Sequence, residues 1–570
     1  MTRFNTGRIY TFLLGICLVF LSACSSQTSA PQEERAGNGK VHTGTGSEPS
    51  TRAQRISRIP PRSAPPAAAR LYEKSMTTAD FSGYRPSSYQ YGRNTEKYQH
   101  IDANPVQRVA EHPVSTFSID VDTGSYANVR RMLEHGQLPP ADAVRVEEMV
   151  NYFDYRYPVP ADRDTPFKVS TEIAPTPWNR NTHLLRIGIK GYDVARNRIP
   201  PANLVFLVDV SGSMRAPNKL ELLKSSLTLL SKQLGRRDRV SLVVYAGASG
   251  VVLEPTPGNR RAKIISALRH LTAGGSTNGE AGIKLAYAMA EQGFIRNGIN
   301  RVILATDGDF NVGIANVDAL KNLIEDKRKS GISLTTLGFG MGNYNDQMME
   351  QLADTGNGNY AYIDNLNEAN KVLVQQMSST LFTIAKDVKV QIEFNPAVVS
   401  EYLLVGYENR KLRREDFNND RIDAGEIGAG HSVTALYEIT LTGNSTRIEP
   451  LRYGIPSTVA PGKSSELAFL RLRYKAPDGN KSKLIEWPLK RNDVLPRIER
   501  ASDDFRFAVA VAGFAELLRG GKQTGSFDYR NVLNLAMDSR GKDRFGYRGE
   551  FIKLVNLAES LTESETAIRN

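Results

Sequence analysis

The sequence is poor in cysteine and histidine, the residues that most often hold zinc or carry nucleophilic catalysis. Only two of its 570 residues are cysteines, Cys17 and Cys24, and its seven histidines are scattered. It contains neither H-E-x-x-H nor G-x-S-x-G, the motifs of zinc proteases and serine hydrolases. We expect Cys17 to be removed with an N-terminal signal. The single remaining cysteine then excludes an internal disulfide and a thiolate zinc site.

The N-terminal hydrophobic run is short. It spans residues 9–20, follows Arg3 and Arg8, and ends at the letters LSAC, residues 21–24. A run of this length is too short for a permanent transmembrane helix and predicts a signal peptide over residues 1–23. The letters LSAC resemble a bacterial lipobox, which implies lipidation of Cys24; the alternative is an ordinary cleavage site beside a cysteine. Lipid on Cys24 would anchor the chain to a membrane surface.

These features predict a location in the cell envelope. In a Gram-negative host, Ser25 after the lipidated cysteine resembles the signal for sorting to the outer membrane, so we expect a protein that faces the periplasm or the cell surface. Residues 24–100 are rich in Ser, Thr, Gly, Pro and Arg and lack any sustained period, which predicts a disordered tether. The net charge of +12 is scattered, without a basic and aromatic stripe. We therefore expect no nucleic-acid partner.

The rest of the chain falls into three segments. Residues 101–198 mix short strands and helices, which predicts an N-terminal α+β domain. Strands and helices alternate over residues 202–385, the pattern of an α/β domain with a mostly parallel sheet. Residues 386–570 begin with strands and end with helical patterns, which predicts a β-rich and helical C-terminal domain.

Oxygen-bearing side chains follow the predicted buried strands of the middle segment. Asp209, Ser211 and Ser213 follow the strand LVFLV, Thr277 lies in GGSTNG, and Asp307 follows VILAT. Because the carboxyl ends of parallel strands share one edge of a sheet, these five side chains can converge there. Hard oxygen donors suit Mg²⁺, Mn²⁺ or Ca²⁺ and do not suit zinc. The alternative is that the two serines only cap the next helix, but capping does not account for Thr277 and Asp307.

The five residues resemble the metal-ion-dependent adhesion site of von Willebrand factor A-type domains, and none departs from that pattern. The resemblance implies a doubly wound, Rossmann-like sheet, a bound Mg²⁺, and a partner protein whose carboxylate completes the coordination. The letters HPVSTFSIDVDTGSYANVRRML and DFNNDRIDAGEIGAGHSVTALYEI resemble the domains that flank such a domain in bacterial lipoproteins.

A second pair of motifs resembles the active site of an aspartic protease. Residues 122–125 read Asp-Thr-Gly-Ser and residues 354–356 read Asp-Thr-Gly, as in the two lobes of an aspartic protease. Such an enzyme needs two equivalent strand loops whose carboxylates share a proton. Here Asp354 ends a helical pattern, whereas Asp122 lies between a strand and a helix. We therefore expect no protease site.

Three functions stay open. We expect a non-enzymatic protein that binds a partner through the metal. A metal-dependent hydrolase is the second hypothesis, since a divalent ion can activate water, although the sequence indicates no general base beside the site. The third is an envelope protein whose ion only stabilises the fold.

Overall fold

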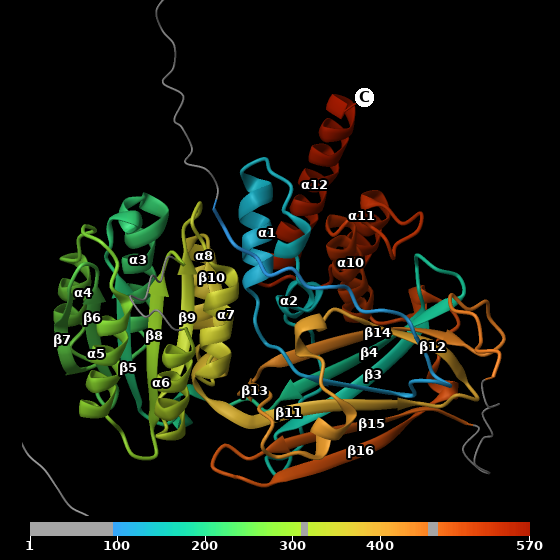
Figure 1. The fold of residues 1–570 in the computed structure, drawn as a ribbon, viewed down its shortest axis with the longest axis horizontal. Helices are drawn as coiled ribbons and strands as arrows, with labels where there is room; N and C mark the ends of the chain where they lie inside the picture. The colour runs from blue at the N-terminus through green and yellow to red at the C-terminus, as the bar shows by residue number, and fades with distance from the viewer. Residues whose placement is uncertain (1–94, 309–316, 454–464, 570) are drawn as a thin grey trace, which may run out of the picture. The chain divides into compact units, whose positions relative to one another are not determined.

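The computed structural model describes residues 95–308, 317–453 and 465–569 (Figure 1). The predicted signal peptide, the predicted lipidation site Cys24 and the predicted tether up to residue 94 lie outside these residues. Within the described ranges, no helix is both long and apolar enough to cross a membrane.

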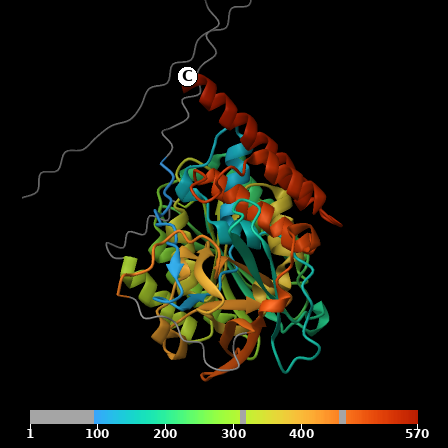
Figure 2. The same ribbon diagram turned by 90° about the vertical axis from the view of Figure 1, so that its right-hand side faces the viewer.

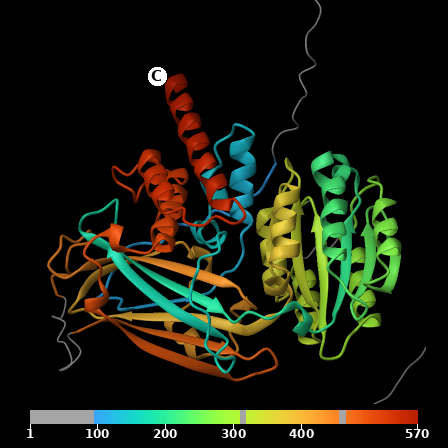
Figure 3. The ribbon, with the colours of Figure 1, turned by 180° about the vertical axis from the view of Figure 1, so that it is seen from behind.

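Residues 202–308 and 317–381, here called the central unit, form a six-stranded sheet with helices on both faces (Figures 1 and 3). The strand order is β10-β9-β8-β5-β6-β7; neighbouring strands are parallel except for β7, which pairs antiparallel with β6. The strands are β5 (Ala202–Asp209), β6 (Arg239–Tyr245), β7 (Ser249–Pro257), β8 (Ile299–Thr306), β9 (Ser333–Phe339) and β10 (Tyr360–Ile363). This arrangement confirms the predicted doubly wound α/β fold.

The apolar run of β5 explains why this strand lies in the middle of the sheet. Leu204 and Phe206 pack on one face, Val205 and Leu207 pack on the other, and all four are fully buried. The first face is covered by α3 (Leu222–Ser231), α4 (Arg261–Arg269), α8 (Leu366–Asn370) and α9 (Met377–Leu381). The second face is covered by α5 (Gly279–Gln292), α6 (Val317–Lys329) and α7 (Asp346–Thr355).

The described segments before and after the central unit, residues 95–199, 382–453 and 465–569, form one body, here called the flanking body. Its first sheet has the order β1-β12-β14-β4-β3, and its second has the order β13-β11-β15-β16, with β2 also paired to β11. The strands before the central unit are β1 (Gln107–Arg108), β2 (Val114–Ser118), β3 (Phe167–Pro175) and β4 (Thr182–Gly191). Those after it are β11 (Thr383–Phe394), β12 (Val399–Val405), β13 (Gly425–Gly428), β14 (Ser432–Leu441), β15 (Glu466–Lys475) and β16 (Ser482–Lys490). Both sheets therefore combine strands from the two sides of the central unit.

The two sheets of the flanking body share one apolar core, and helices cover the outer face of the first sheet. Side chains alternate along β15 as in a half-buried strand: Leu470 and Leu472 are fully buried between partly exposed arginines. The helices are α1 (Gly124–Glu134), α2 (Val146–Asn151), α10 (Asp503–Leu518), α11 (Tyr529–Asp538) and α12 (Tyr547–Arg569), the long red helix of Figure 2.

Candidate functional site

Two buried carboxylates lie where the direction of chain winding changes in the central sheet. Asp209 is the last residue of β5, and Asp307 directly follows β8, its parallel neighbour. The chain continues from β5 to β6 on one side and reaches β8 on the other, and such a switch point is where ligands usually bind in parallel α/β sheets. Both carboxylates are 0% exposed. Two buried acids at this edge are placed to receive a cation.

Asp209 is held by donors from three segments. Its Oδ1 accepts the backbone N–H of Ser211 at 2.8 Å, and its Oδ2 accepts the hydroxyl of Thr306 at 2.9 Å and that of Tyr245 at 3.3 Å. Burial and, to a smaller extent, the charge of Asp307 raise the pKa of Asp209 from 3.8 to about 6, against the lowering effect of its hydrogen bonds to Ser211 and Thr306. The hydrogen bonds thus fix the orientation of the Asp209 carboxylate, but these donors are neutral and do not balance its negative charge.

The two serines face each other in the loop after β5. Their Oγ atoms are 2.9 Å apart, Ser211 is buried and Ser213 is exposed. Ser211 precedes a short 3₁₀ helix, Gly212–Arg215, but its side chain makes no capping hydrogen bond to it. Helix capping therefore does not explain Ser211, which speaks against the alternative interpretation of these serines.

Thr277 lies half-buried in the loop before α5. This loop is tied to the serine loop by two backbone hydrogen bonds: Gly274 N–H to Val210 O at 2.8 Å, and Gly212 N–H to Gly275 O at 3.0 Å. Gly275 has φ +86°, a conformation that L side chains rarely adopt. The glycines of GGSTNG thus allow the turn that brings Thr277 to the edge where Asp209 and Asp307 lie.

Sequence reasoning missed a lysine at this edge. The Nζ of Lys219 lies 2.8 Å from Oδ2 of Asp307 and 2.9 Å from Oδ1 of Asn343, and its side chain is 8% exposed. A signal was present, since Lys219 directly precedes Leu220, the first of the apolar residues on the predicted helix face. A lysine beside such a face is usually interpreted as a solvated residue, so the pattern alone did not single it out.

The donor set fits a hard divalent ion. Two carboxylates and three hydroxyls, with neither sulfur nor imidazole among them, match the preferences of Mg²⁺. Asp209, Ser211, Ser213, Thr277 and Asp307 would hold the ion, and the hydrogen bonds to Thr306 and Tyr245 would orient Asp209 beneath it.

The loop after β9 continues this edge and binds the start of the described chain. Thr95 and Lys97 donate their backbone N–H groups to Gly342 O and Tyr344 O, each at 2.8 Å. Glu96 accepts the N–H of Gly342 at 2.8 Å and pairs with the buried Arg131 at 2.9 Å. Residues 95–97 therefore form a short parallel connection to the loop that carries Asn343, the partner of Lys219.

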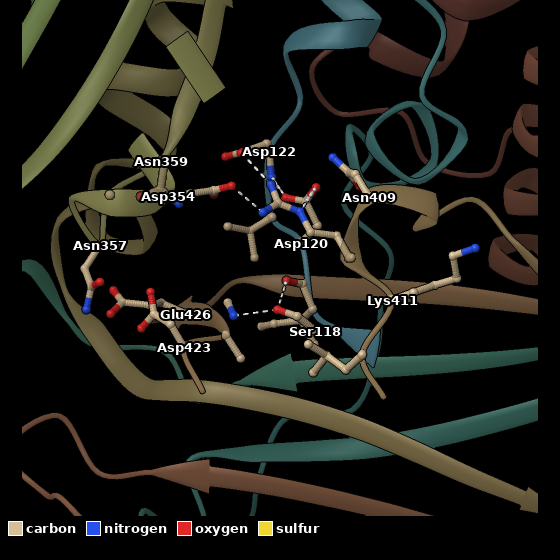
Figure 4. Close-up of a pocket in the computed structure, with 17 residues that line it drawn as sticks. Ser118, Asp120, Asp122, Asp354, Asn357, Asn359, Asn409, Lys411, Asp423 and Glu426 are labelled. Atoms are coloured by element: carbon tan, nitrogen blue, oxygen red, sulfur yellow. Dashed lines mark hydrogen bonds and ion pairs between the residues drawn. The ribbon is translucent and has the colours of Figure 1, made fainter. Parts of the chain in front are cut away.

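The two Asp-Thr-Gly motifs lie at one cavity. Asp122 and Asp354 both line a space of about 250 Å³, and the guanidinium of Arg410 binds both carboxylates (Figure 4). Burial, together with the charge of Asp120, raises the pKa of Asp122 well above its ordinary value. An arginine between the two carboxylates prevents the direct proton sharing of a protease dyad. The structure thus agrees with the expectation of no protease, even though the two motifs meet.

This cavity lies beside a cluster of mostly buried charges between the central unit and the flanking body, here called the charged junction; its member Asp354 is 42% exposed. Its members are Asp120, Asp122, Arg145, Glu148, Asp346, Glu350, Asp354 and Arg410. Carboxylate oxygens of Asp120, Glu148 and Glu350 lie within 4.8 Å of one another. Arg145 binds Glu148 and Asp346, and Arg410 binds Asp120 and Glu350. Both guanidiniums thus already occupy the space between these acids.

A second buried arginine group joins the C-terminal helices to the central unit. Arg130 on α1, 1% exposed, binds Asp364 and Glu368 after β10 and Glu550 on α12. The Nη1 of Arg130 also donates to the hydroxyl of Tyr152 at 2.9 Å.

Comparison with known families agrees with the architecture. The pattern "von Willebrand factor type A domain" matches residues 203–376, "von Willebrand factor" matches residues 92–186, and "Uncharacterized protein YfbK, C-terminal" matches residues 379–561. A solved structure, "von Willebrand factor type A from Catenulispora acidiphila", aligns with 70% of this chain and 91% of its own at 15% identity, with a TM-score of 0.38.

Among curated proteins, "Uncharacterized protein YfbK" of Escherichia coli K12 is 49% identical over 476 residues, which cover 82% of each chain. Human "Inter-alpha-trypsin inhibitor heavy chain H3" is 23% identical over 265 residues, 43% of this chain and 29% of its own length. The chain belongs to the family of the Escherichia coli protein YfbK and carries a von Willebrand factor type A domain.

Proposed function

We propose that this protein is a lipid-anchored binding protein of the cell envelope, which uses a divalent ion, Mg²⁺ or else Mn²⁺ or Ca²⁺, to bind a carboxylate of a partner protein. The observation that carries the proposal is the pair of buried carboxylates, Asp209 and Asp307, at the switch point of the central sheet. Hydroxyls of Ser211, Ser213 and Thr277 lie in the loops beside them.

The residue types favour binding over hydrolysis. With only two carboxylates and three neutral hydroxyls, a bound ion would keep positive charge and a position for an outside oxygen ligand. Exposed Ser213 and half-buried Thr277 would lie on the solvent side, where a partner can approach, and the two aspartates would hold the ion from below. Lys219, whose Nζ contacts Asp307, donates hydrogen bonds through its ammonium and cannot serve as a general base for water. We therefore propose that the protein is not an enzyme.

Anchoring at Cys24 completes the proposal. It rests on the sequence LSAC after a short apolar run. Expressed in cells fed a fatty-acid analogue, the wild-type chain should be labelled and should sediment with membranes, and Cys24→Ala should be neither. A labelled Cys24→Ala chain would show that the lipid is attached elsewhere.

Capture of the partner tests the metal-dependent step. The full chain is crosslinked in envelope extract with Mg²⁺, with EDTA, and as the variant Asp209→Ala with Mg²⁺. A protein captured only by wild type with Mg²⁺ would support the proposal and identify the partner. Identical capture in all three would mean that any ion only stabilises the fold. Hydrolysis of a substrate in a screen with Mg²⁺ and Mn²⁺, lost in Asp209→Ala, would favour the enzyme instead.

A further inference from the structure

Lys219 provides a fixed positive charge inside the candidate metal site. Its Nζ donates to Asp307 at 2.8 Å and to Asn343 at 2.9 Å, and the side chain is 8% exposed. Long lysine side chains usually extend their ammonium into water. This one is directed inward, onto a carboxylate expected to hold the ion.

The loop after β9 holds the lysine in place. Gly340 has φ +77°, and a Cβ added there would lie 2.4 Å from both Cγ and Cε of Lys219. The glycine therefore lets the backbone pack directly against the side-chain carbons of the lysine. Asn343, three residues later, accepts from the ammonium. Since both contacts come from one loop, the ammonium has little freedom to leave Asp307.

The charges of the site show what this lysine does. Asp209 and Asp307 contribute two negative charges, and Lys219 contributes one positive charge. A divalent ion would bring this group to a net charge of plus one, which a single carboxylate neutralises. Without the lysine, the ion alone would neutralise the two aspartates, and a carboxylate ligand would leave a buried negative charge. Charges a few ångströms apart in a partly buried site interact strongly.

We propose that Lys219 is a built-in counter-charge, which weakens binding of the divalent ion and in return makes the ion-loaded site select an anionic ligand. The inference rests on the proposed function, because it concerns the same metal site. It adds a specificity-determining residue that does not itself bind the ion.

Calorimetric titration with Mg²⁺ tests the first half. The proteins are the full wild-type chain, Lys219→Met, and the matched control Lys329→Met, which removes a lysine that is 62% exposed at the end of α6. Lys219→Met should bind Mg²⁺ about tenfold more tightly than wild type, because a nearby positive charge is lost. Lys329→Met should bind like wild type. Lys219→Gln, whose amide can still donate to Asp307, replaces Lys219→Met if the latter does not melt cooperatively.

Acetate tests the second half, with acetamide as its neutral counterpart. In wild type, acetate should tighten the apparent binding of Mg²⁺ and acetamide should not, whereas in Lys219→Met the two should act alike. Equal Mg²⁺ affinity in wild type and Lys219→Met, or an acetate effect that survives the substitution, would overturn the inference and leave the proposed metal site standing. Cooperative folding of both proteins without any Mg²⁺ binding would overturn the proposed function as well.

Discussion

Carboxylates lie near both ends of the strands of the central sheet, and the two groups differ in their counter-charges. At the carboxyl end, Asp209 and Asp307 lie among hydroxyls and one lysine. At the amino end, Asp354 lies near residues 357–359, which precede β10, and Arg410 bridges it to Asp122.

The difference lies in the geometry of the cations. A guanidinium is planar, permanently charged and donates in several fixed directions, so Arg145 and Arg410 each bind several acids at once. Such a pairing leaves little need for an added ion and ties two parts of the chain together. A lysine is a single point charge and hydroxyls carry none, so Asp209 and Asp307 keep the capacity to bind a metal. Acidic residues alone therefore do not identify a metal site; their partners do.

The largest expected effect comes from breaking the charged junction. Arg145→Ala should lower the free energy of unfolding by about 3–5 kcal/mol, because it leaves Glu148 and Asp346 buried without their guanidinium. Denaturant unfolding measures this, with Lys329→Ala as a surface ion-pair control that should change stability by less than about 0.5 kcal/mol. Equal stability of Arg145→Ala and wild type would mean that the junction does not tie the two parts together.

Addition of Mg²⁺ should stabilise the protein through Asp209 and Asp307, and not through the charged junction. At Mg²⁺ a hundredfold above its dissociation constant, the wild-type chain should gain about 2.7 kcal/mol against unfolding. Asp209→Asn should gain nothing, whereas Arg410→Lys should be less stable overall and still show the gain. Thermal melts with Mg²⁺ and with EDTA separate these cases. A gain that survives Asp209→Asn and disappears in Arg410→Lys would place the ion at the junction.

An effect of similar size is expected in the pH dependence of stability, to which Asp209 contributes. Its pKa is raised from 3.8 to about 6 in the folded protein, so the folded state binds this proton more tightly than the unfolded state. In EDTA the contribution of Asp209 to stability is therefore present below pH 3.8 and is lost as the pH rises through about 6, by about 3 kcal/mol. Asp209→Asn should lack this loss. Unfolding followed between pH 4 and 7 checks it, and parallel profiles of the two proteins would contradict it.

The smallest effect is expected for Ser213. Its hydroxyl is exposed and contacts Ser211, so Ser213→Ala should change stability by less than about 0.5 kcal/mol. Mg²⁺ affinity should nevertheless fall several-fold, since one neutral oxygen donor is lost. Calorimetry measures the affinity, with Ser330→Ala, an exposed position directly after α6, as a control. An unchanged affinity would remove Ser213 from the proposed ligands.

The central unit could be predicted well because its signals are local. A strand buried on both faces must be apolar throughout, as residues 203–208 of β5 almost are, and the polar residues after it then mark the carboxyl edge. Both features lie within a dozen residues of the sequence, so no long-range information was needed.

The rest depends on contacts between distant residues. β2 pairs with β11, so that Phe117 lies opposite Val390, but the sequence of neither strand indicates its partner. The same holds for the contact of Lys219 with Asp307 and for the meeting of Asp122 and Asp354 around Arg410. A side chain's local sequence gives its secondary structure, but its electrostatic partner is set by the tertiary fold.

The short connection formed by residues 95–97 has a mechanical consequence. A force that pulls on the chain before Thr95 acts first on the hydrogen bond from Thr95 to Gly342. It also acts on Glu96, which binds both Gly342 and the buried Arg131. The load therefore arrives on the loop that holds Lys219 beside Asp307 before it reaches the sheets of the flanking body. Gly342, where tension enters the folded chain, is thus adjacent in sequence to Asn343, whose side chain contacts the ammonium of Lys219 beside the candidate site.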